Sequence, residues 1–384
     1  MRDFLALAER FGTPYYHYDV DLIAARAAEF RAHLPNFRLY YAVKANPARV
    51  LLEALRPLVD GADVASGGEL ERALQAGFLP SAISFAGPGK DDDDLRAASG
   101  VGTHVVESIA ELERLRPLGL RSRVMLRVSP LERIQSFGVP IAGLPSPFGV
   151  DEEDLAAAAR ALIEQTESVE FLGVHAHAGS QCSSAAGYAR LMSAVWSIAD
   201  RLEKEHGLIS SRLCFGGGIG AAEAEGQQRM DLRALGEKVR PLVAAHRPAE
   251  LVLELGRALV AEAGTYVARV VATKISRGKK FVILDGGTNH HLLSSPYYAP
   301  GPRPRPRLLN LSAPERATEL VTVVGPLCTP LDVLGADVVL PELRAGDLVG
   351  IAAAGAYGLS LSPVLFLSHP LPRELYSRGP ETWA

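Results

Sequence analysis

The chain has few cysteines, and their spacing excludes two classes of small protein. Its 384 residues include three cysteines, Cys182, Cys214 and Cys328. An odd number at wide spacing fits neither a disulfide framework nor a zinc site built from Cys-x-x-Cys pairs. We therefore expect no metal centre.

Long apolar runs and strong net charge are also missing. The longest weakly polar stretch, residues 348–361, is too short and too rich in glycine to span a bilayer. The first 20 residues lack the apolar run of a secretory signal. A net charge of −4 favours neither nucleic acid nor an anionic membrane as partner. With 48% hydrophobic and 22% charged residues, the composition predicts a globular enzyme of the cytoplasm.

Short apolar or β-branched runs alternate with segments of helical pattern over the first 255 residues. This rhythm predicts an α/β fold of the (β/α)₈ TIM-barrel type. An open doubly wound sheet alternates in the same way and stays an alternative. Helices are expected at 68–76, 108–116, 152–164, 185–205 and 231–245. The eight expected strands are 38–43, 62–66, 83–87, 103–107, 124–128, 171–178, 212–218 and 251–255.

After Gly256 the pattern changes to strands separated by glycine and proline turns, which predicts a second, β domain. Its expected strands are 267–272, 280–284, 320–324, 347–352 and 364–367. Residues 294–307 contain five prolines and three arginines, Arg303, Arg305 and Arg307. Such a segment is either a solvated connection or a cationic surface for an acidic partner.

The segment YYAVKANP, residues 40–47, ends an apolar strand on Lys44. Burial disfavours the charged form of a lysine, and a partly neutral amine can form a Schiff base with a carbonyl group. The simpler interpretation is a lysine whose charged end reaches solvent from the strand end.

Polar residues also follow the other expected barrel strands, at the end where such barrels carry their chemistry. Charges there cost free energy unless they are paired with one another or with a ligand, so their common position predicts one site. These residues are Asp63, Ser66, Glu107, Arg127, His175, His177, Ser180, Glu254 and Arg257.

Three consecutive glycines, Gly216, Gly217 and Gly218, follow the seventh strand. Glycines let backbone N–H groups turn toward an anion, so with Ser180 and the Gly256-Arg257 pair they predict a phosphate site. A glycine triplet alone indicates only a turn. Glu254 can hold a pyridine nitrogen in its protonated form, or it can form a salt bridge with Arg127.

Two loops of the second domain contain further candidates. Cys328 lies in GPLCTPLD, a loop too constrained by glycine and proline to be an ordinary strand. By itself Cys328 could be a small buried hydrophobic residue or a reactive thiol. Tyr357 lies between glycines in GAYG, where it could pack in the core or reach a phosphate.

Seven motifs together resemble the fold-type III pyridoxal-phosphate decarboxylases, which include diaminopimelate and ornithine decarboxylases. They occur in order along almost the whole chain: YAVKANP, GADVASGGEL, HAGSQ, FGGG, ELGR, GPLCTPLD and GAYG. The resemblance implies pyridoxal 5′-phosphate as cofactor, a barrel over residues 26–256, and a β domain formed by 1–25 and 257–384. It also implies a homodimer with shared active sites.

Roles for individual residues follow from this resemblance. Lys44 would form the Schiff base, His177 would stack on the cofactor ring, and Glu254 would pair with the ring nitrogen. Asp63 and Arg127 would support the lysine and the ring. Cys328, from the other subunit, would return a proton to the substrate. The phosphate would be held by Ser180, Gly217, Gly218, Gly256, Arg257 and Tyr357, and the substrate by Arg257, Thr329 and Asp332.

One departure from the family pattern concerns the substrate. After the cysteine, the family carries an acidic residue that binds a distal ammonium, whereas this chain has Thr329. A neutral hydroxyl cannot replace that charge-assisted bond, which is worth about 1.5–3 kcal/mol. Diaminopimelate, lysine and ornithine are therefore disfavoured as free substrates.

The motifs GPLCTPLD, DGGTNHHL and ELGRALVAEAG are most similar to the branch that decarboxylates aminoacyl groups on acyl carrier proteins, the butirosin-type enzymes among them. That resemblance implies an L-amino acid tethered by its side-chain carboxyl, with the acidic carrier protein as partner. Three alternatives stay open: a diaminopimelate decarboxylase, an amino-acid racemase, and a non-catalytic pyridoxal-phosphate carrier.

Overall fold

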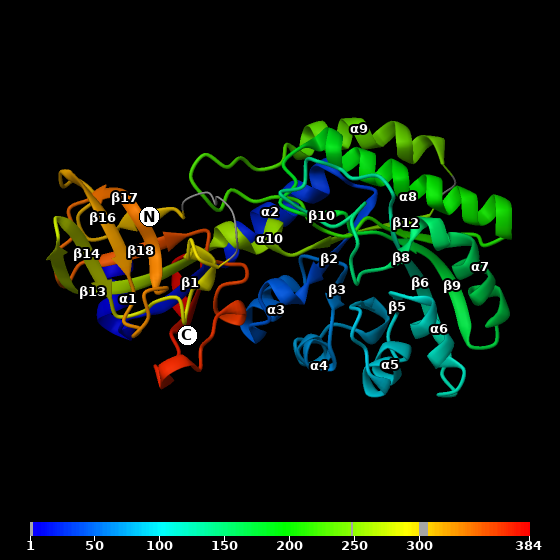
Figure 1. Ribbon diagram of the computed structural model, residues 1–384, viewed down its shortest axis with the longest axis horizontal. Helices are drawn as coiled ribbons and strands as arrows, with labels where there is room; N and C mark the ends of the chain where they lie inside the picture. The colour runs from blue at the N-terminus through cyan, green and yellow to red at the C-terminus, as the bar shows by residue number, and fades with distance from the viewer. Residues whose placement is uncertain (1–2, 247–248, 299–305) are drawn as a thin grey trace. The chain divides into compact units, whose positions relative to one another are not determined.

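The computed structural model describes residues 3–246, 249–298 and 306–384, and the chain divides into two compact units (Figure 1). The barrel unit comprises Ala24–Gly220 and Arg229–Ala258. The β unit comprises Met1–Ile23, Ala221–Gln228 and Leu259–Ala384.

Eight parallel strands form the closed sheet of the barrel unit. Their order is β5-β4-β3-β2-β12-β11-β9-β6, and an additional pairing between β5 and β6 closes the ring. This closure confirms the predicted barrel and excludes the open sheet. The strands are β2 (Phe37–Ala42), β3 (Gly61–Val64), β4 (Ile83–Phe85), β5 (Thr103–Val106), β6 (Ser122–Ser129), β9 (Val169–His175), β11 (Arg212–Cys214) and β12 (Glu250–Leu255).

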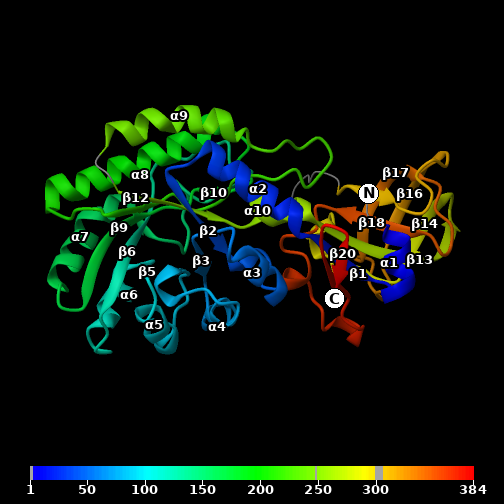
Figure 2. The same ribbon diagram turned by 180° about the vertical axis from the view of Figure 1, so that it is seen from behind.

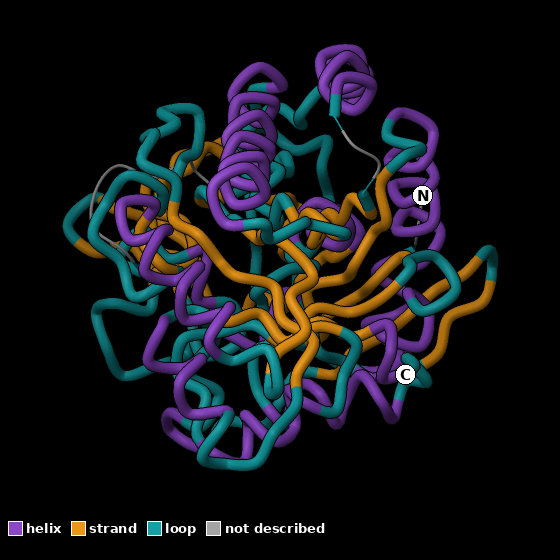
Figure 3. Tube along the Cα trace, turned by 90° about the vertical axis from the view of Figure 1, so that its right-hand side faces the viewer, coloured by secondary structure: helices purple, strands orange, loops and turns teal. Residues whose placement is uncertain are grey.

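Helices lie around the outside of these strands, as seen from behind in Figure 2 and by colour in Figure 3. None of the described helices is both long and apolar enough to cross a bilayer. The helices around the barrel strands are α2 (Val20–His33), α3 (Arg49–Leu55), α4 (Gly67–Gln75), α5 (Asp92–Ser99), α6 (Ile109–Leu115), α7 (Leu155–Glu164), α8 (Ala185–His206) and α9 (Leu232–Ala245).

Side-chain caps start two of these helices directly after their strands. Ser66 accepts a hydrogen bond from the backbone N–H of Glu69, whose carboxylate accepts one from the N–H of Ala65. Ser108 and Glu111 form the same capping box at the start of α6, where the Glu111 carboxylate accepts from the N–H of Glu107. These caps fix the backbone where β3 and β5 end.

The interior of the barrel is filled by side chains from seven of its strands or their ends. This layer packs the barrel centre, so the polar groups must lie beyond it at the strand ends. It consists of Tyr40, Ala86, Val105, Met125, Leu172, Cys214 and Val252.

The β unit is built on one sheet with the order β17-β16-β14-β13-β1-β19-β20, with β18 joining β13 to β15. The N-terminal strand β1 lies between β13 and β19, and α1 (Phe4–Phe11) packs on the sheet through Ala8. The strands are β1 (Tyr15–Asp19), β13 (Gly264–Ser276), β14 (Lys279–Leu284), β15 (Leu308–Asn310), β16 (Thr318–Val324), β17 (Val333–Pro341), β18 (Leu348–Ala352), β19 (Arg373–Arg378) and β20 (Glu381–Trp383).

The prediction of a strand at residues 364–367 of this unit is wrong. The segment forms turns and a short 3₁₀ helix, with Leu365 88% exposed and Leu367 at a φ of 57°. Exposed apolar residues in a left-handed backbone cannot continue a sheet. Of the three predicted surface arginines, Arg303 and Arg305 lie outside the described residues, and Arg307 is exposed.

Candidate active site

Lys44 lies in the 3₁₀ turn Val43–Ala45 directly after β2, and its amine contacts the end of β3. Its Nζ donates to Oδ2 of Asp63 over 3.1 Å. The Lys44 side chain is 48% exposed, whereas that of Asp63 is 1% exposed. The desolvation expected for this lysine is therefore only partial. The side chain is thus partly accessible, and its amine contacts a buried carboxylate.

Glu254, near the end of β12, is paired with His175 at the end of β9. The Nε2 atom of His175 lies 3.0 Å from Oε2 of Glu254, and both side chains are buried. The predicted alternative, a salt bridge between Glu254 and Arg127, is replaced by this pair. Cys214 of β11 completes the group, since its sulfur and the histidine and carboxylate ligand atoms lie within 4.8 Å of one another.

Such a His-Cys-Glu group could ligate a metal ion, but hydrogen bonding accounts for its contacts. Burial, followed by the charge of Glu254, raises the pKa of the Cys214 thiol well above its ordinary value. The thiol therefore keeps its proton and can donate it toward the carboxylate.

Asp63 and Glu254, two buried carboxyl groups of the site, have opposite pKa shifts. Burial and then the charge of Glu254 raise the pKa of Asp63, and Lys44 opposes them. Burial also acts to raise the pKa of Glu254, but His175 and Lys44 outweigh it and hold that pKa below its ordinary value. Glu254 is thus ionised at neutral pH, and Asp63 is the group that can accept a proton there.

Arg127, in β6, is held by Glu107 at the end of β5. Its guanidinium donates to Oε1 of Glu107 over 2.7 Å and lies over the ring of Phe148, 4.9 Å from the centroid. The other oxygen of Glu107 accepts from the N–H of Gly149 over 3.0 Å. Glu107 therefore ties Arg127 to the loop that contains Phe148.

The three glycines after β11 lie directly against the loop that carries His177. Gly216 and Gly218 have φ values of 59° and 84°, and a Cβ at Gly216 would meet the His177 ring. The N–H of Gly217 donates to Nδ1 of His177 over 3.1 Å, so this amide orients the ring. Burial, then Arg127 and Lys44, lower the pKa of His177 to about 3. The ring is therefore neutral, with its proton on Nε2.

The remaining barrel residues expected to hold a phosphate follow β9 and β12, the two strands that flank β11. Ser180 belongs to β10 (Gly179–Ser180), which pairs with β7 (Val139–Pro140). Gly256 follows β12, and a Cβ there would meet the Cβ of Ala45 at 2.9 Å, beside Lys44. Arg257 follows Gly256 as the first residue of α10 (Arg257–Val260). Phosphate binding by these residues stays a prediction.

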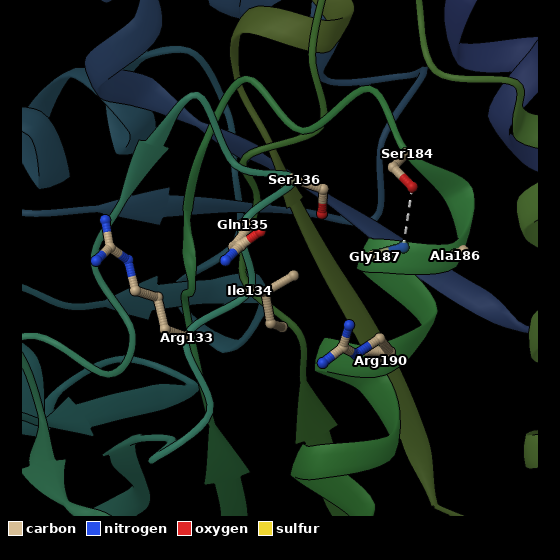
Figure 4. Close-up of a pocket in the computed structure, with 8 residues that line it drawn as sticks. All are labelled: Arg133, Ile134, Gln135, Ser136, Ser184, Ala186, Gly187 and Arg190. Atoms are coloured by element: carbon tan, nitrogen blue, oxygen red, sulfur yellow. Dashed lines mark hydrogen bonds between the residues drawn. The ribbon is translucent and has the colours of Figure 1, made fainter.

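A pocket of about 460 Å³ lies between the loop after β6 and the start of α8. Figure 4 shows Arg133 and Ser136 on the loop side and Ser184 and Arg190 on the helix side. Because α8 follows β9, the pocket is at the carboxyl ends of the strands.

Four predicted residues belong to the β unit. Cys328 is exposed on the loop between β16 and β17, so it is not a buried hydrophobic residue. The backbone N–H of Leu331 donates to the hydroxyl of Thr329 over 3.3 Å. Asp332 is 2% exposed and accepts hydrogen bonds from its own unit. Tyr357 is partly buried at a φ of 54°, a conformation that costs free energy for a non-glycine residue.

His175, Cys214 and Glu107 are the residues to which the sequence alone assigned no role. Their spacing contains a usable signal, because His175 precedes His177 by two residues and Cys214 precedes the glycines by two. The pairing of β11 with both neighbours aligns Cys214 with His175 and Val252, which brings Glu254 alongside.

Comparisons with known proteins agree with this geometry. Residues 20–261 match the family model of the pyridoxal-dependent decarboxylases, specifically their pyridoxal binding domain. The L-glutamyl-[BtrI acyl-carrier protein] decarboxylase of Niallia circulans is 35% identical over 97% of this chain and 91% of that protein. The 2-[(L-alanin-3-ylcarbamoyl)methyl]-2-hydroxybutanedioate decarboxylase of Staphylococcus aureus is 30% identical over 94% of each. A diaminopimelate decarboxylase structure from Helicobacter pylori, with L-lysine bound, has a TM-score of 0.87 at 29% identity, over 99% of this chain and 95% of that chain.

Proposed function

This chain belongs to the family of pyridoxal-dependent decarboxylases, and we propose that it decarboxylates an aminoacyl group held by its side-chain carboxyl on an acyl carrier protein. The pyridoxal-dependent decarboxylase activity follows from the family. The carrier-bound substrate is the specific part of the proposal, and the composition of the loop that carries Cys328 supports it.

The strand ends of the barrel unit fit pyridoxal phosphate. Lys44 offers an accessible amine, Asp63 has one buried oxygen without a hydrogen-bond partner, and the glycine turn has no side chain that would fill the space above it. Lys44 would hold the aldehyde carbon, Glu254 the ring nitrogen, and His177 one face of the ring. Ser180, the glycine turn, Gly256 and Arg257 would hold the phosphate, joined by Tyr357.

When bound, the cofactor supplies an electron sink for the pair of electrons left when carbon dioxide departs. Glu254 stays ionised near neutral pH, so it can keep a pyridine nitrogen protonated. His177 is neutral, so it can lie against a cationic ring without repelling it. Asp63, 3.1 Å from Lys44, can take a proton from the ammonium and leave a nucleophilic amine.

Cys328 would complete the reaction by delivering a proton to the α-carbon of the substrate. Its side chain is exposed, unlike those of Cys182 and Cys214, which are buried. Exposure is required of a group that must meet a substrate.

The observation that carries the carrier-bound substrate is the lack of an available acid on the Cys328 loop. Residues 325–332 contain one acidic residue, Asp332, and both of its carboxylate oxygens accept hydrogen bonds from groups of the same unit. Thr329, next to Cys328, is neutral. A free diamino acid would leave its distal ammonium without an anionic partner on this loop, whereas a thioester-linked side chain carries no charge there.

The names of the two curated relatives support the same interpretation. One acts on a glutamyl group carried by a protein, and the other on an alanin-3-yl group joined to a carbamoyl group. In both, the part of the substrate distant from the α-carbon is covalently linked rather than a free ammonium.

Carbon dioxide release from three substrates tests the proposal: glutamyl-carrier thioester, free glutamate and diaminopimelate. We expect release from the thioester at least tenfold faster than from either free amino acid. Faster release from diaminopimelate would contradict the carrier-bound substrate. Loss of chirality without carbon dioxide release would indicate a racemase.

The acidic carrier would be attracted by the arginines at 303, 305 and 307, through electrostatic steering. Replacing all three with glutamine should raise the KM for the thioester substrate severalfold and leave the turnover of a small thioester unchanged. An unchanged KM for the carrier-bound substrate would remove these arginines from the proposal.

We also propose a homodimer with shared active sites, in which Lys44 and Cys328 of one site come from different subunits. Mixing the inactive variants Lys44→Ala and Cys328→Ala tests it, because mixed dimers would regain one intact site of two. Random mixing should restore about one quarter of the native activity. No recovery, with exchange of subunits verified, would contradict shared sites.

A further inference from the structure

The loop that carries Cys328 is closed on itself by the aspartate at its end. Residues 325–332 connect β16 to β17, with Cys328 and Thr329 near the tip and Asp332 next to β17. The N–H of Gly325 donates to the backbone oxygen of Asp332 over 3.1 Å. The first and last residues of the loop are thus joined directly.

The side chain of Asp332 adds three hydrogen bonds from two separate segments. Oδ1 accepts from the N–H of Thr288 over 2.7 Å and from the Thr288 hydroxyl over 2.8 Å. Oδ2 accepts from the N–H of Leu327 over 2.8 Å. Leu327 directly precedes Cys328, so this bond fixes the backbone on which the thiol is carried.

Two glycines make room for this carboxylate. A Cβ at Gly287 or at Gly325 would collide with the carboxylate oxygens of Asp332, and one at Gly325 would also meet Gly287. The segments 286–288 and 325–327 therefore approach the same side chain closely. A larger residue at Gly287 or Gly325 would force the loop to move.

The chemistry of these contacts distinguishes Asp332 from a substrate-binding acid. It is 2% exposed, and the donors around it are two backbone amides and one hydroxyl. Hydrogen bonds to a charged acceptor are the stronger kind, and their loss would leave buried N–H groups unsatisfied. Asp332 is therefore held as a structural anion of the loop.

We propose that Asp332 is a positioning residue, which sets the place and reactivity of Cys328 through the backbone of Leu327 and does not itself bind substrate. The proposal rests on the proposed function only in giving Cys328 the proton-delivering role. It replaces the substrate contact expected for Asp332 from the sequence.

The variant Asp332→Asn tests the proposal with a minimal change of shape. One amide oxygen can still accept from Thr288, but the NH₂ group must then face the N–H of Leu327, so two donors meet. The loop should loosen beside Cys328. Asp337→Asn is the matched control, because Asp337 is an exposed aspartate of β17 in the same unit.

The first measurement is the alkylation rate of Cys328 with iodoacetamide as a function of pH. Cys328 is exposed and the other two cysteines are buried, so the label reports on this loop. We expect Asp332→Asn to raise the rate at least threefold and Asp337→Asn to leave it unchanged. A wild-type rate in Asp332→Asn would overturn the proposal.

The second measurement separates positioning from general damage. Asp332→Asn should lower kcat about tenfold, leave KM and the visible absorbance of the bound cofactor unchanged, and raise the fraction of substrate protonated at the wrong atom. A rise in KM with unchanged kcat would instead show that Asp332 contacts substrate, and would also overturn the proposal.

A third variant covers the case in which Asp332→Asn does not fold. Thr288→Val removes one of the three donors and keeps the backbone amide, so it should change alkylation in the same direction by a smaller factor. If it does not, the proposal is wrong. A wild-type enzyme that releases no carbon dioxide would refute the proposed function, and the alkylation rates would still decide whether Asp332 sets the loop.

Discussion

The strand ends of the barrel unit and the Cys328 loop of the β unit both bury carboxylates, but they pair them differently. At the barrel strand ends the charges meet other titratable groups, as Lys44 meets Asp63 and His175 meets Glu254. In the β unit the carboxylate of Asp332 is held by neutral N–H and O–H donors.

This difference separates two tasks. Paired titratable groups respond to the charge of a ligand, because a proton can move within a pair such as Lys44 and Asp63. A carboxylate held by backbone amides and a hydroxyl fixes the shape of its loop. We infer that the barrel unit supplies the responsive electrostatics of the cofactor site and the β unit supplies a fixed loop.

Removing the amine of Lys44 should have the largest effect on cofactor binding and on kcat. Lys44→Ala should abolish the visible absorbance of the bound cofactor and lower kcat by on the order of 10³-fold or more, because the covalent link is lost. Absorbance spectra with added cofactor check this. Lys279→Ala, at a partly exposed lysine of the β unit, should behave as wild type. Retained absorbance in Lys44→Ala would refute the assignment.

Glu254→Gln keeps the shape of the side chain and removes its charge. A neutral amide cannot hold the ring nitrogen protonated, so kcat should fall on the order of 10²-fold while the cofactor still binds. Steady-state rates at saturating cofactor measure the effect. A rate within a factor of three of wild type would show that the charge of Glu254 is dispensable.

Each unit contains a buried histidine with a lowered pKa, so the effect of acid on stability can be compared between the two units. Burial lowers the pKa of His291 in the β unit to about 4, as burial first of all lowers that of His177 in the barrel unit to about 3. The unfolded chain binds these protons near pH 6.5, so between pH 6.5 and 4 it holds more protons than the folded chain. The free energy of unfolding therefore has its full value above pH 6.5 and decreases as the pH falls below 6.5.

For His291 this loss amounts to about 2 kcal/mol between pH 7 and pH 5. His291→Gln should remove that part of the slope, which urea unfolding at several pH values can measure. If the free energy of unfolding of the variant falls with pH as steeply as that of wild type, His291 does not control the acid sensitivity of the β unit.

The smallest expected effect is on the pH dependence of activity. His175 holds the pKa of Glu254 low, so His175→Gln should raise that pKa and move the acid limb of the kcat profile upward by about one pH unit. At pH 7 the variant should retain most of its activity. An acid limb at the wild-type position would separate His175 from the ionisation of Glu254.

Much of the barrel could be predicted from the sequence because buried parallel strands are short apolar runs with helical segments between them. The β unit was harder. Its strands β1, β15, β17, β19 and β20 were missed, and 364–367 was wrongly predicted as a strand, because an apolar run does not reveal whether it is buried. Leu365 is apolar and 88% exposed.

At the site, the sequence supplied residue types and their positions at strand ends, but not their partners. The pairing of His175 with Glu254 depends on the register of β9, β11 and β12, which join residues 79 positions apart. The hydrogen bonds of Asp332 depend likewise on a contact with Thr288, 44 positions earlier. Such long-range pairings leave no local pattern.

The most direct test of the central claim is to locate the cofactor on the chain without altering any residue. Reduction of the wild-type enzyme with borohydride in the presence of pyridoxal phosphate should fix the cofactor to one lysine, which peptide mapping identifies. The account predicts the peptide containing Lys44. A label on any other lysine, with Lys44 unmodified, would contradict the assignment of the cofactor site to the barrel unit.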